Sequence, residues 1–319
     1  MAAAAYRFFD FKPHPDDMLR EVLAGLTAEP KTIAPKYFYD ERGSSLFEAI
    51  TRLPEYYLTR TELGLLDACL PEVRDAIGEG GCVVEYGAGS SLKIRKLLET
   101  LHPDAYLPVD ISRLPLERAA AELLRDFPRL RVYPTCADLT EPLTLPAIVA
   151  GCEKLGFYPG SSIGNFEPDA ARRFLANVAR SLGAGAHLLI GVDRKKERAV
   201  LEAAYNDAAG VTSEFNRNVL RHLNHALDAD FNVDGFRHLA RYNEGQGCIQ
   251  MFLESAEEQT VRLNGAEIRF ARGETVHTEN SYKYHPHEFE ALAAAGGFAC
   301  RATWTDSAEY FSLLLLQAA

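Results

Sequence analysis

Short apolar runs alternate with amphipathic runs between Gly81 and Asp193, and this alternation constrains the fold more than any other feature of the sequence. The apolar runs have the length of strands, and the runs between them place apolar residues at helical spacing. Such an alternation predicts a parallel, doubly wound sheet with helices on both faces, an α/β fold. The strand-like runs are CVVEYG, AYLPVDI, LRVYPTCADL, KLGFYPGSSIG and AHLLIGVD, and the helical runs are SLKIRKLLETL, PLERAAAELLRDF and DAARRFLANVARSLG.

The carboxyl-terminal region adds a different pattern. A helical run, HPHEFEALAAAGGF, is followed by two strand-like runs, RATWTD and YFSLLLL, which a tight acidic turn joins. Two consecutive strands with so short a connection predict an antiparallel edge on the otherwise parallel sheet.

The remaining sequence predicts a second domain. The chain has 319 residues, and domains average about 150 residues, so two are expected. Residues 16–27 have helical spacing, a helix is expected from about Thr59 to Leu70, and beyond Asp193 a helical region at 196–228 precedes several strands at 235–283. We therefore expect a cofactor-binding domain made of 61–194 and 285–319, and an α+β substrate-binding domain made of 8–60 and 195–284.

Composition narrows the class of protein. Lys and Arg total 34 against 45 Asp and Glu, a net charge of −11, which disfavours nucleic acid as a partner. The six cysteines are scattered with no CxxC pair, so we expect them to be reduced. No apolar run approaches the roughly 18 residues of a membrane span, and the first residues lack the pattern of a signal peptide. We expect a cytoplasmic enzyme that acts on a small molecule.

The sharpest local motif is EYGAGSS, residues 85–91, which lies between a strand-like and a helical run. Gly87 and Gly89 allow a tight turn and a close approach of the backbone to a ligand. Asp110, 21 residues after Gly89, ends the next strand, where a carboxylate can accept hydrogen bonds from both ribose hydroxyls. Asp138 ends the third strand and can accept from an adenine amino group.

This layout favours S-adenosylmethionine over a dinucleotide. A dinucleotide-binding turn has a third glycine three positions on, and here that residue is Leu92. S-adenosylmethionine carries no phosphate, and the acidic Glu85 suits its sulfonium and amino groups. A dinucleotide, or an ordinary strand–helix turn with surface aspartates and no cofactor, remain the alternatives.

Four motifs together resemble one family, the ergothioneine-pathway L-histidine Nα-methyltransferases. They are PKYFYDERGSSLFEAITRLPEYYLTRTE at 35–62, VVEYGAGSSLKIRKLL at 83–98, PGSSIGNFEP at 159–168 and HTENSYKY at 277–284. The resemblance implies a Rossmann-like class I methyltransferase fold. It implies three transfers from S-adenosylmethionine to the α-amine of L-histidine, giving hercynine in the first step of ergothioneine biosynthesis. It also implies a two-domain monomer with the substrate between the domains.

The resemblance also assigns residues. Gly87, Lys93, Asp110, Asp138 and Leu139 match positions that hold S-adenosylmethionine, beside Gly89 of the same turn. The residues that match the family's histidine site are Tyr56, Asn165 and Tyr205 for the amino and carboxylate groups, Glu279 and Ser281 for the imidazole, and Tyr39 and Met251 as further lining. Tyr39, a bound water or prior binding of the neutral amine are the candidates for removing the amine proton.

These residue types fit methyl transfer to an amino acid. The reaction needs an unprotonated amine and no metal, so positioning and electrostatics should dominate. Asn165 offers both a donor and an acceptor for the amine and carboxylate, and tyrosine hydroxyls donate without adding positive charge. Glu279 can accept from an imidazole N–H while Ser281 serves the other nitrogen. One such bond is worth about 1–3 kcal/mol, or roughly 5- to 150-fold in affinity.

Each assignment has a plainer alternative. Tyr56 and Tyr57 could be core aromatics, and Asn165 could cap the helix that begins at Pro168 or make an Asx turn. Glu279 could be solvated, and Lys93 could be an exposed helix residue. Arg42 and Arg52 are expected to pair only with Asp40, Glu41 or Glu48. The histidine pairs His222/His225 and His285/His287 have no further ligand at the usual spacing, so no metal is expected. The alternative functions are methylation of another amino acid or small amine, and a catalytically silent binding protein.

Overall fold

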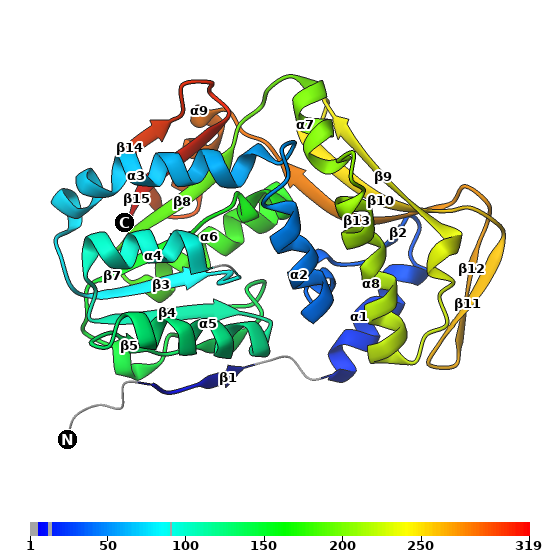
Figure 1. Cartoon of the computed structure of the whole chain (residues 1–319), viewed down its shortest axis with the longest axis horizontal. Helices are drawn as coiled ribbons and strands as arrows, with labels where there is room; N and C mark the ends of the chain where they lie inside the picture. Colours follow the sequence, from blue (N-terminus) through cyan, green and yellow to red (C-terminus); the bar gives the residue numbers. More distant parts are fainter. Residues whose placement is uncertain (1–5, 12–14, 90) are drawn as a thin grey trace. The chain divides into compact units, whose positions relative to one another are not determined.

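The computed structural model describes residues 6–11, 15–89 and 91–319, and the chain folds into two compact units. Unit 1 comprises the described parts of 1–12 together with Leu58–Lys195 and Lys283–Ala319, and unit 2 comprises the described parts of 13–57 together with Lys196–Tyr282. The chain therefore passes between the units several times, and each unit is built from separate stretches of sequence (Figure 1).

Unit 1 is built on a nine-stranded sheet in the order β1-β6-β4-β3-β7-β8-β15-β14, with β5 beside β4. The pairs from β1 to β8 are parallel, whereas β15 pairs antiparallel with β8 and β14 antiparallel with β15. The predicted parallel sheet with an antiparallel edge is confirmed. The strands are β1 (Phe9–Phe11), β3 (Cys82–Tyr86), β4 (Ala105–Asp110), β5 (Arg131–Val132), β6 (Thr135–Ala137), β7 (Lys154–Tyr158), β8 (His187–Asp193), β14 (Phe298–Thr305) and β15 (Phe311–Ala318).

The helices of unit 1 follow the predicted alternation. Helix α5 contacts β4, α6 contacts β7, and α9 contacts β14 and α6. The central strands are buried along nearly their whole length, because helices and loops cover the sheet. The helices are α3 (Tyr57–Ile77), α4 (Ser91–Leu101), α5 (Arg113–Asp126), α6 (Pro168–Leu182) and α9 (Pro286–Ala295), with the short 3₁₀ turns η2 (Ala147–Val149) and η3 (Ser162–Asn165).

Three sequence predictions in this unit were wrong in detail. The run LRVYPTCADL forms two strands, β5 and β6, because Pro134 between them has no N–H for the ladder. The helix expected to end near Leu70 continues through Pro71 to Ile77. Residues 8–12 were assigned to the second domain, but Phe9–Phe11 pair with Thr135–Ala137 at the edge of the unit 1 sheet. Phe8 packs against Ala88, Leu116 and Cys136, so apolar burial anchors this strand.

Unit 2 is an α+β unit. Its main sheet has the order β2-β13-β10-β9, and β11 and β12 form a separate hairpin. Helix α8 contacts β9 and β10 of this sheet and also contacts α2 and η1. Figure 1 shows α2 and α8 side by side. The strands are β2 (Lys31–Thr32), β9 (Phe236–Asn243), β10 (Cys248–Ser255), β11 (Gln259–Leu263), β12 (Ala266–Phe270) and β13 (Thr275–Tyr282); the helices are α1 (Pro15–Thr27), η1 (Pro35–Phe38), α2 (Glu41–Ile50), α7 (Arg198–Tyr205), α8 (Val211–Leu227) and η4 (Val233–Gly235).

Among the helices of the described residues, none combines the length and the apolar character that a membrane crossing requires.

Candidate active site

The glycine turn lies where the sequence predicted it, between β3 and α4 at the carboxyl edge of the unit 1 sheet. Gly87 has a φ of 76°, a conformation that other residues rarely adopt. The N–H groups of Gly87 and Ala88 both donate to the Val109 carbonyl, at 2.8 and 3.1 Å, which holds the turn against β4. A methyl group added at Gly89 would meet no atom within 4 Å. The backbone there faces open space, as a ligand cradle requires.

Two carboxyl groups lie on one side of this turn, at the ends of β4 and β6, which are neighbours in the sheet. Asp110 is the last residue of β4, and its Oδ1 accepts from the Ser112 N–H at 2.8 Å. Burial raises the Asp110 pKa to about 6, against the hydrogen bonds from Ser112 that lower it. Asp138 directly follows β6, and its Oδ1 accepts from the N–H and the hydroxyl of Thr140 at 2.8 and 2.6 Å. Carboxyl ends of parallel strands at one sheet edge are the usual site for a nucleoside ligand.

Glu85, the residue proposed to suit the cofactor's positive charge, is only 2% exposed. Its carboxylate accepts a hydrogen bond from the Tyr106 hydroxyl on the neighbouring strand β4. Burial raises the pKa of Glu85 to about 8, although the Tyr106 bond and the nearby Lys93 both lower it. A buried acid of this kind favours a cationic ligand, because a nearby cation stabilises its ionised form.

Lys93 in α4 is held by a residue that the sequence analysis did not single out. Its Nζ lies 2.5 Å from Glu62 Oε2, and the two side chains are 14% and 0% exposed. Both oxygens of Glu62 also accept from the Gly160 N–H, at 3.0 Å each. The alternative that Lys93 is an exposed helix residue is therefore wrong. The carboxylate of Glu62 therefore holds both the Lys93 side chain and the backbone at Gly160, just after β7.

Asn165 ends the 3₁₀ turn η3, which follows the Gly160 segment. Ser161, the N-cap residue that precedes this turn, has a φ of 59°. Its Oγ accepts from the N–H of Asp193, at the end of β8, at 2.8 Å. The N-cap residue of α6 is Glu167, so the alternative that Asn165 caps this helix is wrong. The structure holds the Asn165 segment at the carboxyl edge of the sheet, through bonds to α3 and β8.

In unit 2, aromatic rings connect several of the predicted substrate residues. The Tyr39 ring packs on Phe47 and Phe215 with centroids 5.8 Å apart in each pair. Phe47 packs on Tyr56 at 6.3 Å, and Tyr56 packs on Tyr205 at 6.5 Å, both edge to face. The Tyr205 hydroxyl then donates to Ser281 Oγ at 2.8 Å. Tyr39, Tyr56, Tyr205 and Ser281 therefore belong to one cluster.

The imidazole-reading residues predicted from the sequence lie on β13. Glu279 and Ser281 are two residues apart, so their side chains project from the same face of the strand. Met251 on β10 is the cross-strand partner of Glu279. Glu279 is 7% exposed, so the alternative of a solvated strand residue is wrong. A buried carboxylate beside a hydroxyl can bind both nitrogens of an imidazole.

Other predictions resolve locally. Arg52 pairs with Glu48 as expected, but Arg42 pairs with Glu214 at 3.5 Å, because α2 packs against α8. Within 6–11, 15–89 and 91–319, no group of three or more His, Cys, Asp or Glu residues is arranged to hold a metal ion.

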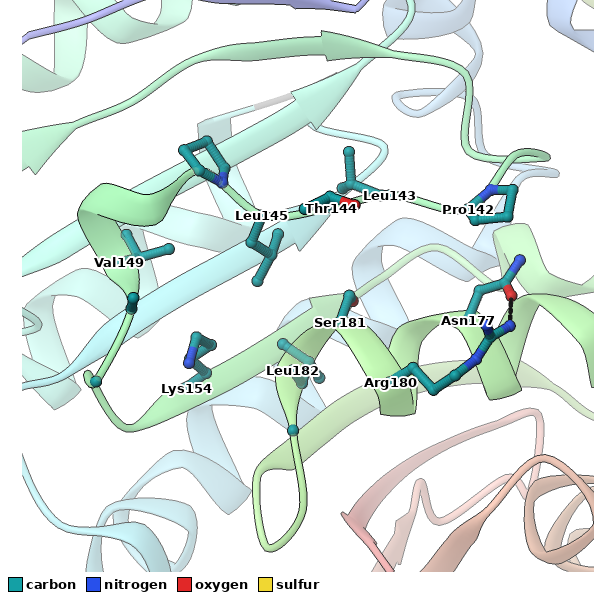
Figure 2. A pocket seen from close by; sticks show the side chains of 14 residues that line it. Pro142, Leu143, Thr144, Leu145, Val149, Lys154, Asn177, Arg180, Ser181 and Leu182 are labelled. Atoms are coloured by element: carbon teal, nitrogen blue, oxygen red, sulfur yellow. Dashed lines mark hydrogen bonds between the residues drawn. The ribbon is translucent and has the colours of Figure 1, made fainter.

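A cavity of about 520 Å³ lies elsewhere in unit 1 (Figure 2). Residues 142–146 form one wall, and Asn177, Arg180, Ser181 and Leu182 of α6 form the other. Lys154 and Gly183 complete it near the starts of β7 and β8. Because this edge of the sheet is opposite the carboxyl ends of the strands, the cavity is separate from the glycine turn.

Comparison with known proteins decides the family. A family model described as histidine-specific methyltransferase, SAM-dependent, matches residues 18–318, nearly the whole chain. The chain belongs to this family of histidine-specific methyltransferases. The predicted family resemblance, the methyltransferase activity and the use of S-adenosylmethionine are confirmed.

Individual relatives agree with the family. The Histidine N-alpha-methyltransferase of Mycolicibacterium smegmatis is 41% identical over 303 residues, which cover 93% of each chain. The Ergothioneine biosynthesis protein 1 of Neurospora crassa is 33% identical over 291 residues, which cover 88% of this chain and 32% of that protein. A solved S-adenosylmethionine-dependent methyltransferase from Clostridium acetobutylicum has a TM-score of 0.50 at 12% identity, covering 86% of this chain and 98% of that one. This last likeness confirms the Rossmann-like fold.

Sequence reasoning missed Glu62 and Phe47 in these clusters. Both lie inside the quoted motif at 35–62, so the motif contained them without indicating their partners. For Glu62 the signal was an acid inside an apolar helical stretch, which predicts a partnered, buried carboxylate.

Proposed function

We propose that this methyltransferase transfers three methyl groups to the α-amine of L-histidine and releases hercynine, as the first step of ergothioneine biosynthesis. The buried pair of Glu279 and Ser281 on one face of β13 carries the proposal. A carboxylate that is 7% exposed favours a partner with an N–H donor, and an imidazole supplies one. The names of the relatives from Mycolicibacterium smegmatis and Neurospora crassa support the same substrate and pathway.

On the cofactor side, we assign S-adenosylmethionine to Gly87, Gly89, Lys93, Asp110, Asp138 and Leu139. The turn at Gly87 and the open space at Gly89 fit a close ligand, and Asp110 and Asp138 stand at the ends of adjacent strands. When bound, S-adenosylmethionine supplies an electrophilic methyl group on a sulfonium. Burial holds the pKa of Glu85 at about 8, and a bound sulfonium nearby would lower that pKa and favour the ionised carboxylate.

On the substrate side, we assign Asn165, Tyr56 and Tyr205 to the amino and carboxylate groups of histidine, and Met251 to the lining beside Glu279.

Each transfer forms a nitrogen–carbon bond and breaks a sulfur–carbon bond. The new bond needs the lone pair of the nitrogen, so the amine must first lose a proton. Tyr39 is our candidate to direct that proton away, directly or through a water. Tyr39→Phe tests this role, because the ring packing on Phe47 and Phe215 survives while the hydroxyl is lost.

The deciding experiment is product analysis by mass spectrometry with histidine and S-adenosylmethionine. We expect a mass gain of three methyl groups on the α-nitrogen. If another amino acid or amine is methylated and histidine is not, the substrate assignment is wrong. Absence of turnover together with absence of S-adenosylmethionine binding in calorimetry supports the silent binding protein instead.

Three further assignments complete the proposal. We propose that the protein is a monomer, that it works in the cytoplasm, and that no metal takes part. The six cysteines are scattered along the sequence with no CxxC pair, which suits a reducing compartment. An amine with a free lone pair needs no Lewis acid to attack a sulfonium. Light scattering tests the first assignment, fractionation the second, and unchanged turnover in a chelator the third.

A further inference from the structure

A buried amide in unit 2 bonds to three strands, two of which, β10 and β13, carry residues of the proposed histidine site. Asn216 in α8 is fully buried. Its Nδ2 donates to the Phe252 carbonyl on β10 at 2.9 Å and contacts His238 Nδ1 on β9 at 2.8 Å. Its Oδ1 accepts from the Thr278 hydroxyl on β13 at 2.8 Å. One side chain thus bonds to three neighbouring strands of the sheet.

The network continues from His238 to α7. His238 Nε2 lies 2.9 Å from the Tyr205 carbonyl. A carbonyl only accepts, so Nε2 carries the proton, and Nδ1 is left to accept from the Asn216 amide. Tyr205 is the last residue of α7, and His238 donates to its carbonyl at the end of the helix. Both ring nitrogens of a neutral His238 are used.

The surroundings of His238 favour its neutral form. Burial lowers its pKa below the usual value, Arg217 lowers it further, and Asp207 and the bond to Tyr205 act in the opposite sense. If Nδ1 of His238 were protonated, it would face the Nδ2 donor of Asn216 with a second donor, and the hydrogen bond between them would be lost. The network is therefore intact in the neutral form.

The bonded residues are sequence neighbours of residues in the proposed site. Thr278 precedes Glu279, and Phe252 follows Met251 at the point where the register of β10 with β13 shifts. Tyr205 carries the hydroxyl that donates to Ser281. We infer that Asn216 and His238 are positioning residues that fix Glu279, Met251 and Tyr205 for histidine binding, an inference that rests on the proposed function.

A network of this kind specifies one geometry rather than simply filling space. Apolar side chains could fill the volume of Asn216 and Thr278, but they would not fix the irregular register at Met251 and Phe252. Small displacements of positioned groups reduce rates by as much as about 100-fold. The effect of breaking the network should therefore fall on histidine and not on the cofactor.

The test compares two substitutions at Thr278. Thr278→Val keeps the shape and removes the hydroxyl that donates to Asn216, whereas Thr278→Ser keeps the hydroxyl. We expect Val to raise KM for histidine about fivefold or more, and Ser to stay within about twofold of the parent. Calorimetric binding of S-adenosylhomocysteine should be unchanged in both. Thr260→Val on the exposed hairpin strand β11 is the matched control.

Equal KM values for the Val and Ser variants would overturn the inference, as would a Val variant that only melts earlier. A second measurement needs no destabilising change. Nitrogen NMR of the parent should show His238 as the neutral form protonated at Nε2, with a signal that shifts when histidine binds; an Nδ1-protonated ring or an unresponsive signal contradicts the inference. Failure of the parent to methylate histidine refutes the proposed function instead, so the two failures are distinguishable.

Discussion

Replacing Glu279 by alanine should weaken recognition of the imidazole without affecting the cofactor. The carboxylate is 7% exposed on β13, so little water can replace it as an acceptor. A hydrogen bond to a charged group contributes about 1.5–3 kcal/mol, which corresponds to a loss of roughly 13- to 160-fold. We expect kcat/KM for histidine to fall by that factor.

Glu279→Gln isolates the charge, since glutamine keeps the shape and one acceptor. We expect a smaller loss, about 5- to 13-fold, because a charged and a neutral hydrogen bond differ by about 1–1.5 kcal/mol. The assay is initial-rate methylation of histidine and of phenylalanine, with S-adenosylhomocysteine binding measured in parallel. Glu267→Ala, an exposed glutamate on β12, is the control. An unchanged ratio of the two amino acids in Glu279→Ala would refute the assignment of Glu279 to the imidazole.

Three other predictions concern unit 1. Asn165→Ala should raise KM for histidine at least fivefold while calorimetric binding of S-adenosylhomocysteine persists, and equal weakening of both ligands contradicts its role. Lys283 Nζ lies 2.7 Å from Asp193 Oδ2, and both side chains are fully buried. Lys283→Met leaves the Asp193 charge buried without its cation, so it should lower the free energy of unfolding by about 3–5 kcal/mol. Adding Asp193→Asn should restore most of that loss, and denaturant titration measures both variants. Burial raises the pKa of Glu85 from 4.5 to about 8, so Glu85 ionises at a lower pH in the unfolded chain than in the folded protein. The free energy of unfolding should therefore fall as pH rises from about 4.5 to 8, and Glu85→Gln should make the melting temperature less dependent on pH over that range. If the melting temperatures of the parent and the variant change with pH in the same way, the raised pKa is refuted.

The sequence predicted the parts of the fold that depend on local patterning. Strands such as β3 and β8 are buried on both faces, so they are continuous apolar runs that composition alone identifies. Strand β1 has three residues and is held by an edge pairing with a segment more than 120 residues away. No local pattern indicates such a partner, which is why residues 8–12 were assigned to the wrong unit.

The candidate site shows the same limit. The family resemblance placed Tyr205 and Ser281 in one site, and the structure joins them by a hydrogen bond across 76 positions of sequence. Glu62 and Gly160, 98 positions apart, lie in two different motifs, and neither motif indicated that they are bonded. Side-chain partners of this kind depend on packing, which spacing along the chain does not encode.

The chain leaves unit 1 after Lys195 and returns at Lys283. The points of exit and return are adjacent, because the Tyr284 N–H donates to the Asp193 carbonyl at 3.0 Å. Residues 196–282 leave and re-enter unit 1 at neighbouring points, so this stretch imposes little constraint on the fold of unit 1. Substitutions at Tyr205, Met251, Glu279 or Ser281, which all lie within 196–282, should therefore change substrate preference while leaving the strand order of unit 1 and its glycine turn as they are.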